Sequence, residues 1–166
     1  MGEPRIERPF IEPGYGIPKS LKGTLPWSWA RERLDEARIY WVASVRPDGR
    51  PHVTPIWGAW VDEAFWMEGS PRTRRFRNLA ENPAAVVTVE RENDAIIVEG
   101  RCERLTDLDG GLIGRLQAGY AKYESSHGYV PDPEGWQRGG IWRVTPNKVL
   151  GWSAFPRDAT RWVFGT

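Results

Sequence analysis

Short runs of β-branched and aromatic residues, separated by turn-forming residues, are the feature of this sequence that most restricts its fold. They predict strands at 38–45, 52–61, 65–67, 84–89, 95–105, 141–146, 148–152 and 160–164. The connections between them are brief, and Asp48-Gly49 predicts a tight hairpin turn with a positive φ at Gly49. Six to eight short antiparallel strands joined in this way predict a small barrel.

Three helices are predicted among these strands. The first begins near Thr24, which is expected to cap it, with Pro26 in its first turn. The second spans 73–82, where Phe76, Leu79 and Ala80 are expected to form a buried stripe, and the third spans 108–123. Helices added to an antiparallel barrel place the chain in the α+β class.

The remaining long segments are expected to be irregular. Residues 1–23 are rich in Pro and Gly and predict an extended N-terminal arm ahead of a single domain at 24–166. Residues 124–140 predict a long loop. At 166 residues the chain is long enough for one domain with a real core.

Composition argues against several classes of protein. A net charge of +1 disfavours a general nucleic-acid binder. The single cysteine, Cys102, excludes a disulfide framework. The N-terminus lacks the apolar region of a signal peptide, and no segment has the apolar length of a membrane span. We therefore expect a cytoplasmic protein with no membrane partner.

The usual catalytic and metal-binding motifs do not occur in the sequence. The two histidines, His52 and His127, lie far apart, so no metal site is predicted. His52 is expected to cap a hairpin, whereas His127 is either a solvated loop residue or a residue facing a substrate or heme. No nucleophile elbow, dinucleotide fingerprint or P-loop is found, and the catalytic residues stay unassigned.

The second helix carries charges of an unexpected sign. A helix N-terminus has a partial positive charge and favours acidic residues, yet Thr73 at the cap is followed by Arg74 and Arg75. Free backbone N–H groups, a hydroxyl and two guanidinium groups together suit a phosphate. The sequence therefore predicts an anion site at 73–75, with a solvated basic face as the alternative.

Two stretches, "DGRPHVTPIW" (48–57) and "TRRFRNLAENP" (73–83), carry a resemblance to a known family. With "IIVEGRCERL", "WRVTPNKVLGW" and "TRWVF", in the same order, they resemble the pyridoxamine 5′-phosphate oxidase-like family over about residues 27–164. The resemblance implies an antiparallel split β-barrel that binds FMN or the deazaflavin coenzyme F420.

The resemblance also implies where the cofactor lies. Thr73, Arg74 and Arg75 match the family's Ser-Arg-Lys phosphate-binding stretch, with Arg in place of Lys. The positions that match the strand along the isoalloxazine ring are Val53, Thr54, Pro55, Ile56 and Trp57. Those expected near the phosphate and ribityl chain are Glu68, Gly69 and Ser70.

Family members are homodimers with the cofactor between the chains. Trp152, Arg161 and Trp162 are then expected either to complete the neighbour's site or simply to pack in the barrel or dimer. The C-terminus does not match the substrate-binding segment of true pyridoxamine phosphate oxidases, so that activity is not predicted.

The prediction from the sequence is an FMN- or F420-dependent oxidoreductase that transfers hydride to or from a small molecule. The alternative is a split barrel that binds a cofactor or heme without turnover. Extra arginines at positions 72 and 77 fit the polyanionic tail of F420 or simple solvation, so the sequence does not decide between the two cofactors.

Overall fold

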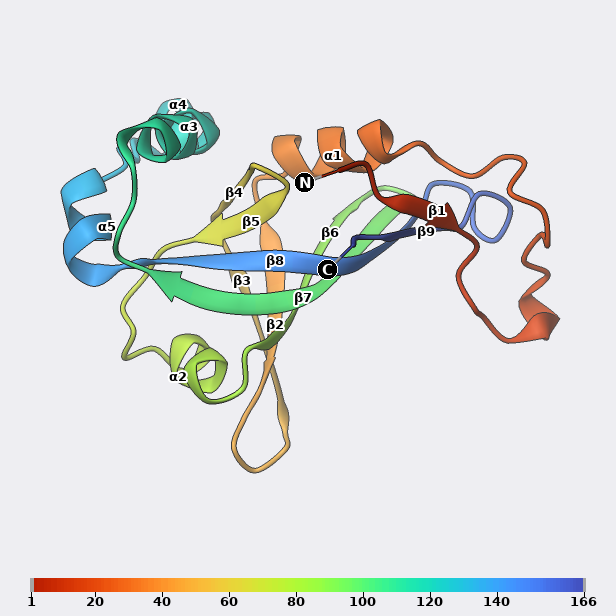
Figure 1. Ribbon diagram of the computed structural model, residues 1–166, viewed down its shortest axis with the longest axis horizontal. Coiled ribbons are helices and arrows are strands. Elements are labelled where there is room, and N and C mark those ends of the chain that lie inside the picture. Colours follow the sequence, from red (N-terminus) through yellow and green to blue (C-terminus); the bar gives the residue numbers. More distant parts are fainter. Residues whose placement is uncertain (1, 166) are drawn as a thin grey trace.

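The computed structural model describes residues 2–165, whose strands form one antiparallel sheet (Figure 1). The strands are β1 (Arg5–Glu7), β2 (Tyr40–Val45), β3 (Pro51–Ile56), β4 (Ala59–Val61), β5 (Ala64–Met67), β6 (Ala84–Arg91), β7 (Asp94–Leu105), β8 (Ile141–Trp152) and β9 (Thr160–Val163). Their order is β1-β9-β8-β7-β6-β2-β3, with β5 also paired to β8 and β4 to β5.

Helices lie on both sides of the long β7–β8 pair (Figure 1). They are α1 (Trp27–Glu36), α2 (Arg74–Glu81), α3 (Gly110–Tyr120), α4 (Glu124–His127) and α5 (Pro133–Gly139), with 3-10 turns η1 (Pro13–Tyr15) and η2 (Ala121–Tyr123). This confirms the α+β prediction. Within 2–165, no helix has both the length and the apolar character needed to cross a bilayer.

Strand β8 is one continuous strand, although the sequence predicted two, at 141–146 and 148–152. It stays continuous because Asn147 is accommodated as a bulge: Lys148 faces Glu99, and Pro146 faces Gly100. The sequence pattern broke there because a proline and an asparagine interrupt the apolar run. In the structure, the long ladder with β7 spans that interruption.

The strand predicted at 52–61 is in fact two strands, β3 and β4, separated by Trp57 and Gly58. A Cβ on Gly58 would lie 2.3 Å from the Phe65 ring, so the backbone crosses that ring closely at this point. The N–H and C=O of Gly58 bond the hydroxyl of Tyr123, at 3.1 and 2.9 Å, instead of a neighbouring strand.

The hairpin predicted at Asp48-Gly49 is confirmed. Gly49 has φ +81°, and its N–H bonds the carbonyl of Arg46 at 2.9 Å. Flanking strands β2 and β3 pair in register from Val45–Pro51 to Tyr40–Ile56.

The predicted cap of the first helix and the predicted long loop at 124–140 were both wrong. Helix α1 begins at Trp27, and the Thr24 hydroxyl bonds the carbonyl of Leu21 rather than capping the helix. The segment 124–140 contains α4 and α5. Helix α5 begins where Asp132 accepts a bond from the Gly135 N–H and so caps it.

Residues 5–7 of the N-terminal segment form β1, which pairs with β9 at the edge of the sheet. The sequence predicted no strand there. A three-residue strand carries too little local pattern to be recognised, and its partner lies at the other end of the chain.

The core has two buried clusters. In the larger one, α1 and α2 pack on the inner face of the sheet through Trp27, Leu34, Phe76 and Leu79, while a smaller cluster lies under α3 and α5. The stripe predicted on α2 was partly wrong: Ala80 is exposed, and Asn78 is buried in its place.

Gly100 faces the β8 bulge, and replacing it with alanine should destabilise the fold. A Cβ there would lie 2.2 Å from the Thr145 carbonyl oxygen, which is backbone and cannot rotate away. We expect Gly100→Ala to lower the free energy of unfolding by about 1–3 kcal/mol, measured by urea denaturation.

Gly114→Ala is the matched control, because nothing lies within 4 Å of the new methyl group and the position is inside α3. It should be neutral or stabilising, since alanine favours a helix over glycine. Equal stability of Gly100→Ala and wild type would contradict the close approach at the bulge.

Candidate anion-binding site

The N-terminus of α2 is the place where the predicted site residues begin. Thr73 occupies the N-cap position, but its hydroxyl makes no capping hydrogen bond. Arg74, the first helical residue, is exposed and makes no hydrogen bond or ion pair with any residue of 2–165. Since the first N–H groups of a helix lack intrahelical partners, this end presents donors and positive charge without an internal acceptor.

Arg75 is held in place by two contacts. Its Nη1 donates to the Thr54 hydroxyl on β3 at 2.7 Å, and its guanidinium lies 4.7 Å from the centre of the Phe76 ring. Phe76 in turn stacks on Trp142 of β8, with ring centres 4.4 Å apart. The Nε of Arg75 is buried and has no partner among the described residues. The side chain is therefore fixed in position while one of its donors stays unused.

The inner face of the β2–β3 hairpin adds two residues that the sequence did not predict for this site. Side chains alternate between the two faces of a strand, so Ser44 of β2 lies on the same face as His52 and Thr54 of β3, and Arg46 follows directly after β2. The Nε of Arg46 and the Nδ1 of His52 are buried without partners in the described chain. The strand alternation was a signal for His52, but nothing local indicated that α2 covers this face.

The charged side chains around His52 affect its pKa. Burial, and then the charges of Arg46, Arg75 and Arg74, lower the pKa of His52. The nearby carboxylate of Asp48 is bound by Arg50 at 2.7 Å, and hydrogen bonds from Arg50 are the main cause of its lowered pKa. Asp48 also interacts electrostatically with Arg46 and Arg74, but its hydrogen bonds go to Arg50, so the cluster keeps an excess of positive charge.

The other predicted site residues are spread more widely. Gly69 lies beside the cluster, since a Cβ there would be 2.9 Å from Phe76 and 3.8 Å from Arg75. Ser70 organises the turn before α2, where its carbonyl accepts from the Thr73 N–H at 3.0 Å. Ile56 lies on the inner face of β3 with Thr54, whereas Val53 and Pro55 lie on its outer face.

Trp57 and Glu68 contact the helical segment that follows β7. Trp57 stacks on Tyr123 with ring centres 5.1 Å apart, and it also contacts His127 at 4.7 Å. The Glu68 carboxylate accepts hydrogen bonds from Tyr129 and from Trp136, each at 2.5 Å. Glu68 therefore fastens this helical segment to the end of β5.

Trp152 lies far from α2 within one chain. It ends β8 and contacts Phe155 at 5.4 Å, whereas the Trp142 that stacks on α2 lies near the other end of the same strand. Ten residues of extended strand span roughly 33 Å.

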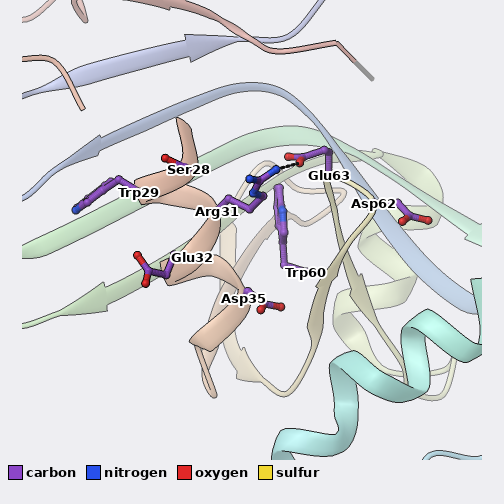
Figure 2. Close-up of a pocket in the computed structure, with 8 residues that line it drawn as sticks. All are labelled: Ser28, Trp29, Arg31, Glu32, Asp35, Trp60, Asp62 and Glu63. Carbon is purple, nitrogen blue, oxygen red and sulfur yellow. Dashed lines mark hydrogen bonds and ion pairs between the residues drawn. The ribbon is translucent and has the colours of Figure 1, made fainter. Parts of the chain in front are cut away.

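A cavity of about 700 Å³ lies between α1 and the β4–β5 turn (Figure 2). Its lining has four acidic side chains, Glu32, Asp35, Asp62 and Glu63, against one cation, Arg31, which pairs with Glu63 at 3.3 Å. An anionic ligand would be repelled there, so this cavity is distinct in charge from the cationic cluster at α2.

Comparison with known proteins places the chain in a family. The sequence profile of the pyridoxamine 5′-phosphate oxidase family matches residues 29–153, so the chain belongs to that family. Its fold is the family's split barrel, which confirms the expected architecture. No protein of curated function matches the sequence.

Three solved structures illustrate the range of ligands among proteins of this fold. An F420 reductase is 25% identical, with a TM-score of 0.55 over 72% of this chain and 94% of the other. A FAD-binding protein from Mesorhizobium loti is 20% identical, with a TM-score of 0.57 over 84% and 96%. A heme-binding protein from Mycobacterium smegmatis is 16% identical, with a TM-score of 0.61 over 86% and 58%.

Glu68→Gln should destabilise the protein even when no ligand is present. A glutamine at this position keeps one acceptor oxygen and turns an N–H group towards a neighbour that is itself a donor. We expect a loss of about 1–3 kcal/mol in the free energy of unfolding, measured by denaturant titration of the ligand-free protein. Glu134→Gln on α5, where the side chain is 83% exposed, should change it little. An unchanged stability for Glu68→Gln would show that the carboxylate is not a structural contact.

Proposed function

We propose that this protein is an oxidoreductase that binds FMN or coenzyme F420 and transfers hydride to or from a small molecule. The observation that carries the proposal is the cationic cluster of Arg46, His52, Arg74 and Arg75. Three of its buried nitrogen atoms have no partner among the described residues. Burying donors and like charges without a partner is costly, and a phosphate group would supply both the charge and the acceptor oxygens.

The residues around the cluster suit a cofactor that extends away from it. In this proposal Thr73, Arg74 and Arg75 hold the phosphate, Gly69 and Ser70 lie beside it, and the ring lies along β3. Strand β3 ends the sheet order, so one edge of its backbone has no neighbouring strand within the described residues 2–165. That edge supplies backbone donors and acceptors for the ring.

The chemistry would come from the bound cofactor, which supplies the hydride transfer. The chain's own part is to bind the phosphate, orient the ring along β3 and exclude water from it. Trp57 lies directly after β3, where its ring stacks on Tyr123 at that end of the strand.

We also propose that the protein is a homodimer that forms through the outer face of the sheet. The register places Pro55, Trp41, Thr88, Ile97 and Leu150 in one row across five strands on that face. Trp41 is 42% exposed on this row. This row is largely apolar as far as β8, and Arg161 of β9 follows it. An exposed apolar row of this kind favours association.

Two-fold symmetry explains how Trp152 could join the site. An isologous contact uses the same face of both subunits. Strands β8 and β3 lie two strands away from β6 on opposite sides. A two-fold axis near β6 therefore places β8 of one chain over β3 of the other. Trp152 shares the outer face with Leu150, so in this arrangement Trp152 of the partner subunit would approach the ring.

A second candidate function is the binding of heme or a cofactor without turnover. The similarity to a heme-binding protein supports it, and so does the placement of His127. This histidine is exposed beside Trp57, and its Nδ1 lies 2.7 Å from the Ser126 hydroxyl, which leaves Nε2 for a ligand. A titration with hemin that produces a Soret band and is abolished by His127→Gln would favour this function.

The cofactor prediction is tested by titrating FMN and F420 side by side. Arg74→Ala and Arg75→Gln should each weaken binding roughly ten- to a hundred-fold, because each removes a charge-assisted hydrogen bond worth about 1.5–3 kcal/mol. Glutamine is used at position 75 because it retains a donor for Thr54.

Arg91→Ala is the control, since Arg91 is exposed at the β6–β7 turn and pairs with Glu36 at 3.4 Å. It should leave affinity unchanged. If both α2 variants bind FMN and F420 as tightly as wild type at the same salt concentration, the helix is only a basic surface and the proposal fails.

The dimer prediction is tested by placing a charge on the outer face. Trp41→Lys should convert the protein to a monomer at micromolar concentration, measured by light scattering, because a lysine is costly to bury in an apolar interface. Val130→Lys, at a side chain 70% exposed outside this face, should stay dimeric. A wild-type monomer with full cofactor affinity would rule out a shared site.

A further inference from the structure

His52 is the residue of the cationic cluster whose charge is free to change. It lies on the inner face of β3, opposite Ser44 of β2 and two residues before Thr54, which bonds Arg75. Its Nδ1 is buried, and no residue of 2–165 is within hydrogen-bonding reach of it. Arginines remain charged at any physiological pH, whereas an imidazole titrates near neutrality.

The charged groups that face His52 come from the hairpin and from α2. The turn contributes Arg46 and the Asp48–Arg50 pair, and β2 itself carries no charged residue. Helix α2 contributes Arg74 and Arg75 at its start, followed by Arg77 and, at its far end, Glu81. Apart from Asp48, which Arg50 already binds, the near side of this environment is positive.

This environment keeps the ring neutral when no anion is present. Burial is the largest cause of the lowered pKa of His52, and the three arginine charges lower it further. A proton on the ring would therefore add a fourth positive charge beside three others. The neutral ring with an unpaired Nδ1 is the state that the ligand-free cluster favours.

We propose that His52 is a further ligand of the bound phosphate group and that it becomes protonated when the anion binds. A phosphate between Arg74 and Arg75 cancels the repulsion that keeps the ring neutral and offers it an acceptor oxygen. The protonated ring then donates to the anion. This inference rests on the proposed function and specifies how that site recognises its ligand.

The sign of the resulting pH dependence follows from linkage. The pKa of His52 starts below its usual value in the free protein and rises in the complex. Between these two values the complex holds one more proton than the free protein. Affinity is therefore greatest at low pH and falls about tenfold per pH unit within that window. A phosphate monoester loses its second proton near pH 6, and the added negative charge strengthens binding as the pH rises. The contribution of His52 to the pH dependence is therefore measured as the difference between wild type and His52→Gln.

The experiment is calorimetric titration with FMN and, in parallel, with F420, at pH 7 in two buffers of different ionisation enthalpy. The difference in heat between the buffers counts the protons taken up on binding. We expect the imidazole of His52 to take up close to one proton when the wild type binds its ligand. His52→Gln lacks this imidazole, so its proton uptake should be lower by that amount. Arg91→Ala is the matched control, because Arg91 is exposed at the β6–β7 turn outside the cluster, and it should take up protons as wild type does.

A second measurement keeps the test valid if His52→Gln folds poorly. The chain has only two histidines, so the imidazole resonances of the wild type can be followed separately by NMR with and without FMN or F420. One ring should titrate at a low pH in the free protein and at a higher pH in the complex, and His127→Gln should leave that signal in place.

The two proposals fail in different ways. If neither FMN nor F420 binds the wild type, the proposed function is wrong and this inference falls with it. If one of them binds with Arg74-dependent affinity, but without proton uptake that His52→Gln removes, the function stands and the role of His52 is overturned.

Discussion

The β7–β8 ladder is the interaction on which the rest of this structure depends. Its two strands pair from Leu105–Ile141 to Ala95–Trp152, with one bulge at Glu99/Gly100. Near its beginning β8 also pairs with β5, and near its end it pairs with β9 instead. One strand thus serves both halves of the split barrel, and the bulge lets the long pair bend between them. Trp142 of β8 receives Phe76 of α2, and β7 pairs with β6, which in turn pairs with β2, so both parts of the site are connected to this ladder.

The cationic cluster is set by packing rather than by internal charge balance. Phe76 on Trp142 anchors α2 to β8, and the same contact fixes the guanidinium of Arg75 above the β2–β3 hairpin. The core therefore holds four cationic or titratable side chains together at a cost in electrostatic energy. Such a cost is typical of a binding site, where the ligand rather than the fold compensates the charge.

Local sequence patterns predicted much of this arrangement. Strand alternation, the Asp48-Gly49 turn and the helix after Thr73 depend on neighbours within a few residues, so the sequence alone was sufficient for the α+β class and for the position of α2. Local patterns failed at the break between β3 and β4, where Gly58 passes close to the Phe65 ring. The loop prediction at 124–140 failed for a different reason, because it overlooked a local signal: Asp132 caps α5 through the Gly135 N–H, three residues further on.

The sequence by itself therefore determined which residue types are available: arginines at a helix start, a histidine on a strand and apolar residues on alternate positions. Only the tertiary structure decided which of them meet. It brought Arg46 and His52 to Arg75 and gave Glu68 to Tyr129 and Trp136. It also separated Trp152 from α2 along β8. The physical reason is that burial and long-range pairing, which local sequence does not encode, set the electrostatic surroundings of each side chain.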